Sequence, residues 1–216
     1  MNVLAAIFID PFVEMVQFPV FFAEVITGGI IVGLMYALVA LGFVLIFKAS
    51  GVFNFAQGVM VLFAALTLAG LMDNGVPIWL AFILTIGAMI LLAFAIERMV
   101  LRPLINQPEI ILFMATIGLT FFLQGFGEMI WGGNIRKLDI GIPQRPFEVG
   151  GMLLNQFDLV AASTAAILVL VLALLFTKTP IGRALRAVAD DHQAALSVGI
   201  SLKYIWVIVW SVAGIV

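Results

Sequence analysis

The chain has 216 residues, of which 64% are hydrophobic and 10% are charged, and its mean hydropathy is +1.26. Soluble domains are close to half apolar and a quarter charged, so this composition indicates an integral membrane protein. The formal net charge of −2 gives no sign of a nucleic-acid partner, and we expect none. Because the chain contains no cysteine, its composition excludes disulfides, thiolate zinc sites and iron–sulfur clusters.

Residues 20–47 form the first expected membrane span, and small residues recur along it every four positions. Gly29, Gly33 and Ala37 share one face of this helix, which favours close packing of a neighbouring backbone. The apolar pattern then breaks at residues 53–57, where Asn54 and Gln57 lie among aromatic residues. These two amides either orient the backbone around a central cavity, as in interrupted transporter helices, or satisfy the backbone at the break itself.

The next apolar run, residues 59–72, is short and predicts a broken or re-entrant segment. Residues 77–96 and 110–131 are the following expected spans. The second of these carries Thr116, Thr120, Gln124 and Glu128 at successive four-residue steps, which form one slanted polar stripe on a helix. Such a stripe either lines a transport pathway or supplies hydrogen bonds between helices. As pathway candidates we take Asn54, Gln57, Thr116, Thr120 and Gln124.

A loop rich in glycine and proline, residues 132–157, precedes another span at 159–177. A polar segment, residues 182–199, follows, and the chain continues with the apolar residues 205–216. This last run is too short to cross a membrane. It is either an interfacial tail or part of a span in a longer protein, and we expect the second, which makes the membrane domain incomplete at its C-terminal end.

The basic residues predict the orientation of the spans. An external N-terminus places seven of them on the cytoplasmic side: Lys48, Arg98, Arg102, Lys178, Arg183, Arg186 and Lys203. Three fall outside, in one loop: Arg136, Lys137 and Arg145. Cytoplasmic loops are enriched in lysine and arginine, so this orientation is favoured. We therefore predict an all-α polytopic membrane protein with five to six transmembrane helices and a single membrane domain over residues 1–216.

No set of residues suggests catalysis, a metal site or a cofactor site. His192 is the single histidine of the chain, and it has no evident serine partner for a nucleophilic site. The chain also lacks a Walker A sequence, so any ATP that drives transport must bind to another subunit.

The polar segment has the pattern of an amphipathic cytoplasmic helix. Its weakly apolar face contains Leu185, Val188, Ala189, Ala195 and Leu196, and its other face contains Arg183, Arg186 and Asp190. The segment is either a docking surface for a cytoplasmic partner or an ordinary solvated loop.

Several motifs resemble known transporter sequences. Gln193-Ala194-Ala195 followed by Gly199 is similar to the Glu-Ala-Ala signature in the coupling loop of ATP-binding-cassette importer permeases, with glutamine in place of the usual glutamate. The chain further resembles the branched-chain amino acid permeases of the Liv type. The motifs that carry this resemblance are Gly33-Leu-Met-Tyr-Ala-Leu38, Gly51-Val-Phe-Asn-Phe-Ala-Gln-Gly58, Glu97-Arg98 with Arg102-Pro-Leu104, Thr116-Ile-Gly-Leu119 and Gly182-Arg-Ala-Leu-Arg-Ala187. Many members have histidine where Gln57 stands and arginine where Ile105 stands.

The resemblance implies a permease of the bacterial inner membrane. Two cytoplasmic ATPase subunits, a second related permease subunit or a second copy, and a periplasmic solute-binding protein would be its partners, besides membrane lipid. Residues 182–200 would be the loop that couples it to the ATPases, through Arg183, Arg186, Asp190, Gln193, Ala194, Ala195 and Gly199. The solute would be a branched-chain or related amino acid. Permeases for urea or short amides, and ATP-independent channels or carriers, stay open as alternatives, whereas a membrane enzyme is disfavoured.

Overall fold

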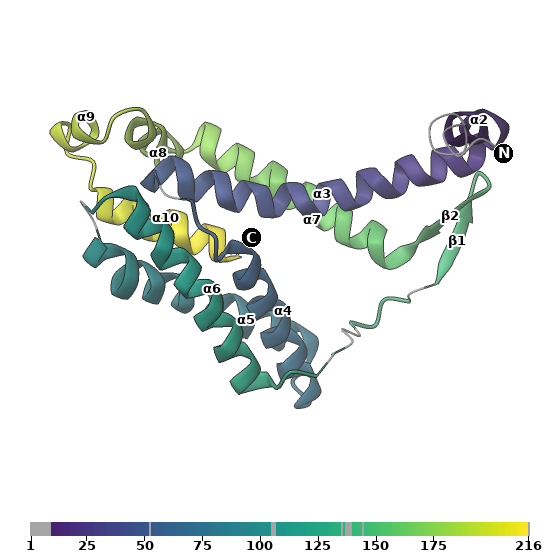
Figure 1. Ribbon diagram of the computed structural model, residues 1–216, viewed down its shortest axis with the longest axis horizontal. Helices are drawn as coiled ribbons and strands as arrows, with labels where there is room; N and C mark the ends of the chain where they lie inside the picture. The colour runs from purple at the N-terminus through teal and green to yellow at the C-terminus, as the bar shows by residue number, and fades with distance from the viewer. Residues whose placement is uncertain are drawn as a thin grey trace. The chain divides into compact units, whose positions relative to one another are not determined.

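The computed structural model describes residues 10–51, 53–104, 107–134, 136, 140–143 and 145–215. The chain forms two compact units, and Figure 1 labels their helices and strands. The first unit contains residues 1–37 and 141–167, and the second contains residues 38–140 and 168–216. Two long helices, α3 (Pro19–Ser50) and α7 (Gln156–Lys178), begin in the first unit and end in the second.

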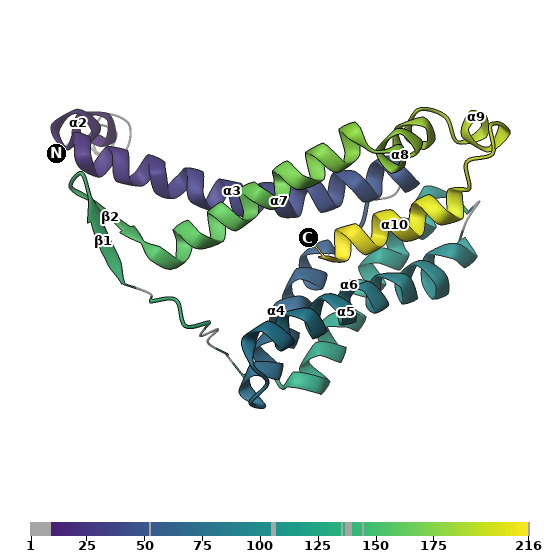
Figure 2. The same ribbon diagram turned by 180° about the vertical axis from the view of Figure 1, so that it is seen from behind.

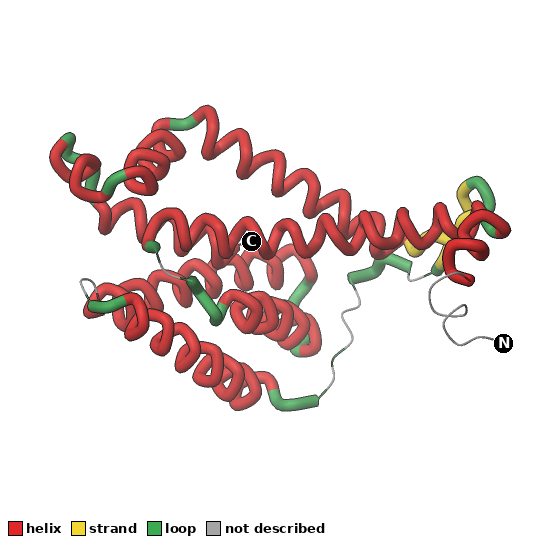
Figure 3. Tube along the Cα trace, turned by 45° about the horizontal axis from the view of Figure 1, so that its top comes forward, coloured by secondary structure: helices red, strands yellow, loops and turns green. Residues whose placement is uncertain are grey.

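The first unit combines the starts of α3 and α7 with α2 (Asp10–Gln17) and a two-stranded antiparallel hairpin. The strands are β1 (Pro146–Val149) and β2 (Met152–Asn155), the yellow segments of Figure 3. Gly150 and Gly151 join them with φ angles of 60° and 86°, which two-residue hairpin turns favour. The sequence analysis expected a loop at 132–157 and did not predict this hairpin. The adjacent glycines at its turn were the sequence signal that could have indicated it.

The second unit is helical throughout the part that the structure describes. After α3, its elements are α4 (Gln57–Asp73), α5 (Ile78–Ala95), the π-helical turn η1 (Ile96–Leu101), the 3-10 turn η2 (Arg102–Leu104), α6 (Glu109–Trp131), α8 (Pro180–Asp190), α9 (His192–Ser197) and α10 (Leu202–Ile215). Figures 1 and 2 show α4, α5 and α6 side by side, with α10 along α5.

Helix α10 lies at the centre of the apolar core of this unit. Its Trp206, Val209, Trp210 and Ala213 are all buried, and its contact with α5 is the most extensive between helices. At Gly214 the two backbones approach closely, because a Cβ atom there would lie 3.1 Å from the Met89 carbonyl oxygen. This run, expected to be either an interfacial tail or part of a span, is therefore a core helix.

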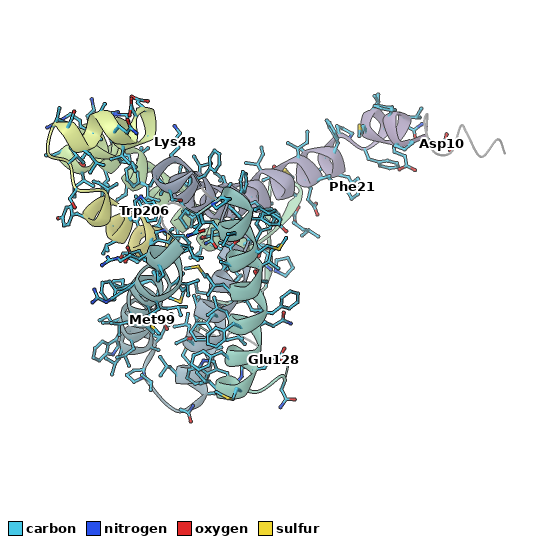
Figure 4. The ribbon with its side chains drawn as sticks, turned by 60° about the vertical axis from the view of Figure 1, so that its left-hand side comes forward. Asp10, Phe21, Lys48, Met99, Glu128 and Trp206 are labelled. Atoms are coloured by element: carbon cyan, nitrogen blue, oxygen red, sulfur yellow. The ribbon has the colours of Figure 1, made fainter. Side chains whose placement is uncertain are left out.

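Four helical segments are long and apolar enough to cross a membrane: Pro19–Ser50, Ile78–Leu104, Ile110–Trp131 and Gln156–Lys178. Many of their large side chains point away from the core, as the outward position of Met99 in Figure 4 illustrates. Leu91, Phe121 and Met129 are 70–74% exposed. Lipid-facing helix surfaces have this character, because lipid tails are as apolar as the side chains. The chain is a polytopic helical membrane protein.

The segment expected to be broken or re-entrant is instead one continuous helix, α4, of 17 residues. It spans about 25 Å, because an α-helix rises about 1.5 Å per residue. Gln57, Gly58 and Asp73 extend it beyond the apolar run, which explains the underestimate from sequence. The break itself precedes α4. The orientation derived from the basic residues stays a prediction.

Candidate functional site

The polar segment forms two short helices rather than the single helix expected from its spacing. Thr179 begins α8, since its hydroxyl oxygen accepts a hydrogen bond from the Gly182 amide at 3.2 Å. At Asp191 the backbone is extended, with φ −156° and ψ 112°, and this ends α8. The Asp191 carboxylate then caps α9 by accepting bonds from the Gln193 and Ala194 amides at 2.8 and 3.0 Å.

Gly199 ends α9 in a left-handed conformation, with φ +85°. The Ile200 amide donates to the Ala195 carbonyl and the Gly199 amide donates to the Leu196 carbonyl, each at 3.0 Å. These two bonds form the glycine-dependent C-terminal motif of helices. Gly199 was expected to permit the close approach of a partner, and its contacts add a second role, the termination of α9.

The two helices have a charged outer face and an apolar inner face. Arg183, Arg186, Asp190, Gln193 and Ala194 are exposed, whereas Leu185, Val188 and Ala195 belong to the core of the second unit. The expected apolar face is therefore right for these three residues and wrong for Ala189 and Leu196, which are exposed. For Leu196 the reason is the extended backbone at Asp191, which changes the helical phase between α8 and α9.

Ala195 requires a correction as a docking residue. It is 2% exposed and packs in the core, so it lies behind the surface that a partner could contact. The neighbouring Ala194 is exposed and is the small residue of the predicted docking surface. We use the name docking surface for the exposed residues of α8 and α9 on which a docking role is predicted: Arg183, Arg186, Asp190, Gln193 and Ala194. Among the described residues, Arg186 and Asp190 form no ion pair with each other, so both charges are available to a partner.

A groove of about 500 Å³ lies behind α8, between the ends of α3 and α7. Its walls are apolar, with Leu45, Leu172 and Phe176 among them, and Lys48 and Arg186 also line it. Basic side chains next to apolar helix surfaces are the composition that lipid headgroup regions favour. Because Lys48 and Arg186 line the same groove, Lys48 and the docking surface share one end of the unit.

The break between α3 and α4 contains the two amides singled out by the sequence. Asn54 and Gln57 are both completely buried. The Asn54 side chain accepts from the Ala56 amide at 3.1 Å and donates to the Gln57 side-chain oxygen at 3.3 Å. Gln57 donates in turn to the Ala213 carbonyl at 3.1 Å. These contacts support the second alternative, that the amides satisfy polar groups at the break, and their pathway role stays a prediction.

The polar stripe on α6 divides into an inner half, with Thr116 buried and Thr120 partly buried, and an exposed half. Thr116 is buried with its hydroxyl within 3.2 Å of the Phe53 carbonyl, and Thr120 donates to the Thr116 carbonyl at 3.0 Å. Gln124 and Glu128 are exposed and line a groove of about 170 Å³ between α4 and α6. In Figure 4, Glu128 lies at the end of α6 that is farther from Trp206 of α10. The inner half thus bonds to protein backbone, and the exposed half remains available to line a path.

The small-residue face of α3 is open in this chain. Gly29 and Gly33 have no described atom within 4 Å of a Cβ built on them, and Ala37 is exposed. The face therefore stays a prediction for packing against another helix.

Two polar features of the core have no role in the sequence analysis. Glu97 is completely buried in η1, where its carboxylate accepts three hydrogen bonds of 2.9–3.1 Å from Arg102. The Trp206 indole donates to the Ala49 carbonyl at 2.9 Å. The opposite charges of Glu97 and Arg102, five residues apart, were a sequence signal for their ion pair. The hydrogen bond between Trp206 and Ala49 joins residues that are distant in the sequence, and no sequence signal indicated it. The described residues contain no cluster of three side chains suited to a metal ion.

The family model for the branched-chain amino acid transport system permease component matches residues 25–216. The chain belongs to this family. The match covers α3 from residue 25 onward and every later element to α10, so the helices α8 and α9, the break and the core helix α10 all lie in the matched region.

Relatives within this family come from bacteria and from an archaeon. The high-affinity branched-chain amino acid transport system permease protein BraD of Pseudomonas aeruginosa is 25% identical over 193 residues, which cover 83% of this chain. The high-affinity branched-chain amino acid transport system permease protein LivH of Salmonella typhimurium is 26% identical over 84% of this chain. The probable branched-chain amino acid transport permease protein LivH of Methanocaldococcus jannaschii is 28% identical over 88% of it. The chain spans 63–64% of the length of these relatives. No solved structure matches it significantly.

Proposed function

We propose that the chain is a permease subunit of an ATP-binding-cassette importer that carries branched-chain or related amino acids across the bacterial inner membrane. Two cytoplasmic ATPase subunits would drive it, a periplasmic binding protein would deliver the solute, and a second permease subunit would complete the channel. The relatives named above belong to branched-chain amino acid transport systems, which supports this class of solute.

The observation that carries the proposal is the construction of α8 and α9. Their outer face presents charges that no described residue neutralises, while their inner face packs into the core of the unit. A partner that binds the outer face therefore moves a segment that is continuous with the membrane helices. Since the sequence contains no Walker A motif, that partner would supply the nucleotide site.

Co-purification from mild detergent tests this proposal. We expect subunits with Walker A motifs to accompany the wild-type chain, and isolation of the chain alone would contradict the proposal. The Arg186→Glu variant should weaken ATPase binding about tenfold, because it reverses a charge on the docking surface. Arg145→Glu is the matched control, since Arg145 is an exposed arginine of the hairpin region on which no docking role is placed.

Uptake measurements separate the importer from an ATP-independent carrier. Uptake of labelled leucine into vesicles should stop when ATP is depleted while the ion gradient is maintained. Uptake that continues under these conditions would favour a channel or secondary carrier, with Gln124 and Glu128 on its path.

A further inference from the structure

The apolar core connects the docking helices to the break between α3 and α4. We call residues 51–56 the α3–α4 junction, of which residue 52 lies outside the described part. Val188 of α8, Trp206 and Trp210 of α10, and Ala49 and Ala56 on either side of the junction belong to one cluster of buried residues. Protein cores are close-packed, so within this cluster a displacement of the docking helices reaches α10 through side-chain contacts, whereas the groove behind α8 leaves room only between α8 and the ends of α3 and α7.

Helix α10 also holds both sides of the junction by hydrogen bonds. Near its start, the Trp206 indole donates to the carbonyl of Ala49, in the last turn of α3, at 2.9 Å. Near its end, the Ala213 carbonyl accepts from Gln57, the first residue of α4, at 3.1 Å. Carbonyls in the last turn of a helix have no partner within the helix, so Trp206 satisfies a group that would otherwise be unpaired.

The junction is the interruption between the helices α3 and α4. Its described residues, 51 and 53–56, lie outside both helices, and Gly51 has a φ of +70°, a conformation that side chains other than glycine rarely adopt. Continuous helices flank it on both sides, and hinges consist of a few residues at the ends of such elements. A Cβ atom on Gly42 of α3 would lie 2.6 Å from the Gln57 amide nitrogen, so the space around this amide is tightly defined.

We propose that the α3–α4 junction is the hinge of the permease and that Trp206 and Gln57 are the positioning residues through which α10 moves it. The inference rests on the proposed function, because the movement originates where an ATPase binds the docking surface. It adds the route and the residues by which that movement reaches the membrane helices.

The two tryptophans of α10 give a matched pair of variants. Trp206→Phe keeps an aromatic ring but removes the donor to Ala49. Trp210→Phe makes the same chemical change one turn later, where the buried indole nitrogen has no hydrogen-bond partner among the described residues. Both side chains are buried, at 8% and 1% exposure, so loss of ring packing affects both variants alike.

The first readout is the ratio of solute transported to ATP hydrolysed, measured in proteoliposomes of the complete complex with labelled leucine. Loss of one hydrogen bond inside a membrane protein corresponds to about 0.6 kcal/mol, which is about a threefold change in an equilibrium. We therefore expect Trp206→Phe to lower the ratio about threefold and Trp210→Phe to leave it unchanged. A purely structural role would lower the amount of folded complex and leave the ratio of the surviving complexes intact.

The second readout follows the junction directly. The chain has no cysteine, so Phe53→Cys, at a side chain that is 54% exposed, introduces one unique thiol at the junction. We expect its rate of maleimide labelling to change when ATP and vanadate trap the ATPases. Trp206→Phe should abolish that change and Trp210→Phe should preserve it.

The outcomes separate this inference from the proposed function. If the wild-type chain binds no ATPase and shows no ATP-driven uptake, the proposed function fails. If the wild type transports leucine but Trp206→Phe retains both the transport ratio and the ATP-dependent labelling change, the hinge inference is wrong and the proposed function stands. Trp210→Phe losses equal to those of Trp206→Phe would also contradict the inference, because ring packing would then explain both.

Discussion

Replacing Gln57 with leucine removes the amide that joins the α3–α4 junction to α10 while keeping a side chain of similar size. The variant loses the bond to the Ala213 carbonyl, of 3.1 Å, and the bond from Asn54, of 3.3 Å. Hydrogen bonds within membrane proteins contribute about 0.6 kcal/mol on average, and an unpaired buried polar group adds a penalty of about 1 kcal/mol or more. We therefore expect Gln57→Leu to lower the free energy of unfolding by about 2 kcal/mol.

Unfolding of the purified chain in mixed micelles with increasing dodecyl sulfate, followed by circular dichroism, measures this difference. Gln124→Leu is the control, because Gln124 is an exposed amide on α6 and its loss should change the stability by less than about 0.5 kcal/mol. Equal stabilities of the two variants would refute the reasoning, since the buried hydrogen bonds would then contribute nothing measurable.

Three further substitutions test the packing that positions the site. Gly182→Ala should destabilise the turn into α8 by about 1–3 kcal/mol, because its Cβ would lie 2.0 Å from the Phe176 carbonyl oxygen; the loss appears as a lower melting temperature in detergent. Gly70→Ala should have an effect of similar size and shift the tryptophan fluorescence, since its Cβ would lie 2.1 Å from the Trp131 ring, and an unshifted spectrum would contradict this contact. Asp191→Ala should weaken α9 by about 1 kcal/mol through loss of its cap, so that the amides of residues 193 and 194 exchange hydrogen faster while overall stability is kept.

The spans and the position of the break follow from the sequence because each depends on neighbouring residues. A long apolar run such as 110–131 specifies a membrane helix by itself, and the structure confirms α6 there. Gly51, Asn54 and Gln57 interrupt the pattern, and α3 ends at Ser50, directly before Gly51, while α4 begins at Gln57. Local composition decides such features because the membrane leaves the backbone few alternatives to a helix.

The features that sequence reasoning missed depend on tertiary contacts or on single backbone angles. The bond between Gln57 and Ala213 joins residues 156 positions apart, and no periodicity announces such a pair. The exposure of Leu196, which was expected on the apolar face, follows from the extended backbone at Asp191, which resets the helical phase inside a segment whose spacing fits one helix. An aspartate in this position could begin a new helix or stay within the old one, and packing of the inner face decides between them.

The strengths of the contacts around α10 suit a permease in which the docking helices move a hinge. The most extensive packing of α10 is with α5, and the close approach of the two backbones at Gly214 leaves little space for one helix to slide along the other. Toward the α3–α4 junction it is held by two neutral hydrogen bonds, each of about 0.6 kcal/mol by the membrane average. Under a force applied at the docking surface, α5 and α10 therefore move together, and the junction is where contacts exchange. If this division is right, a disulfide engineered between α5 and α10 leaves transport intact, whereas one that ties α10 to α3 across the Trp206–Ala49 contact stops transport without preventing ATPase binding.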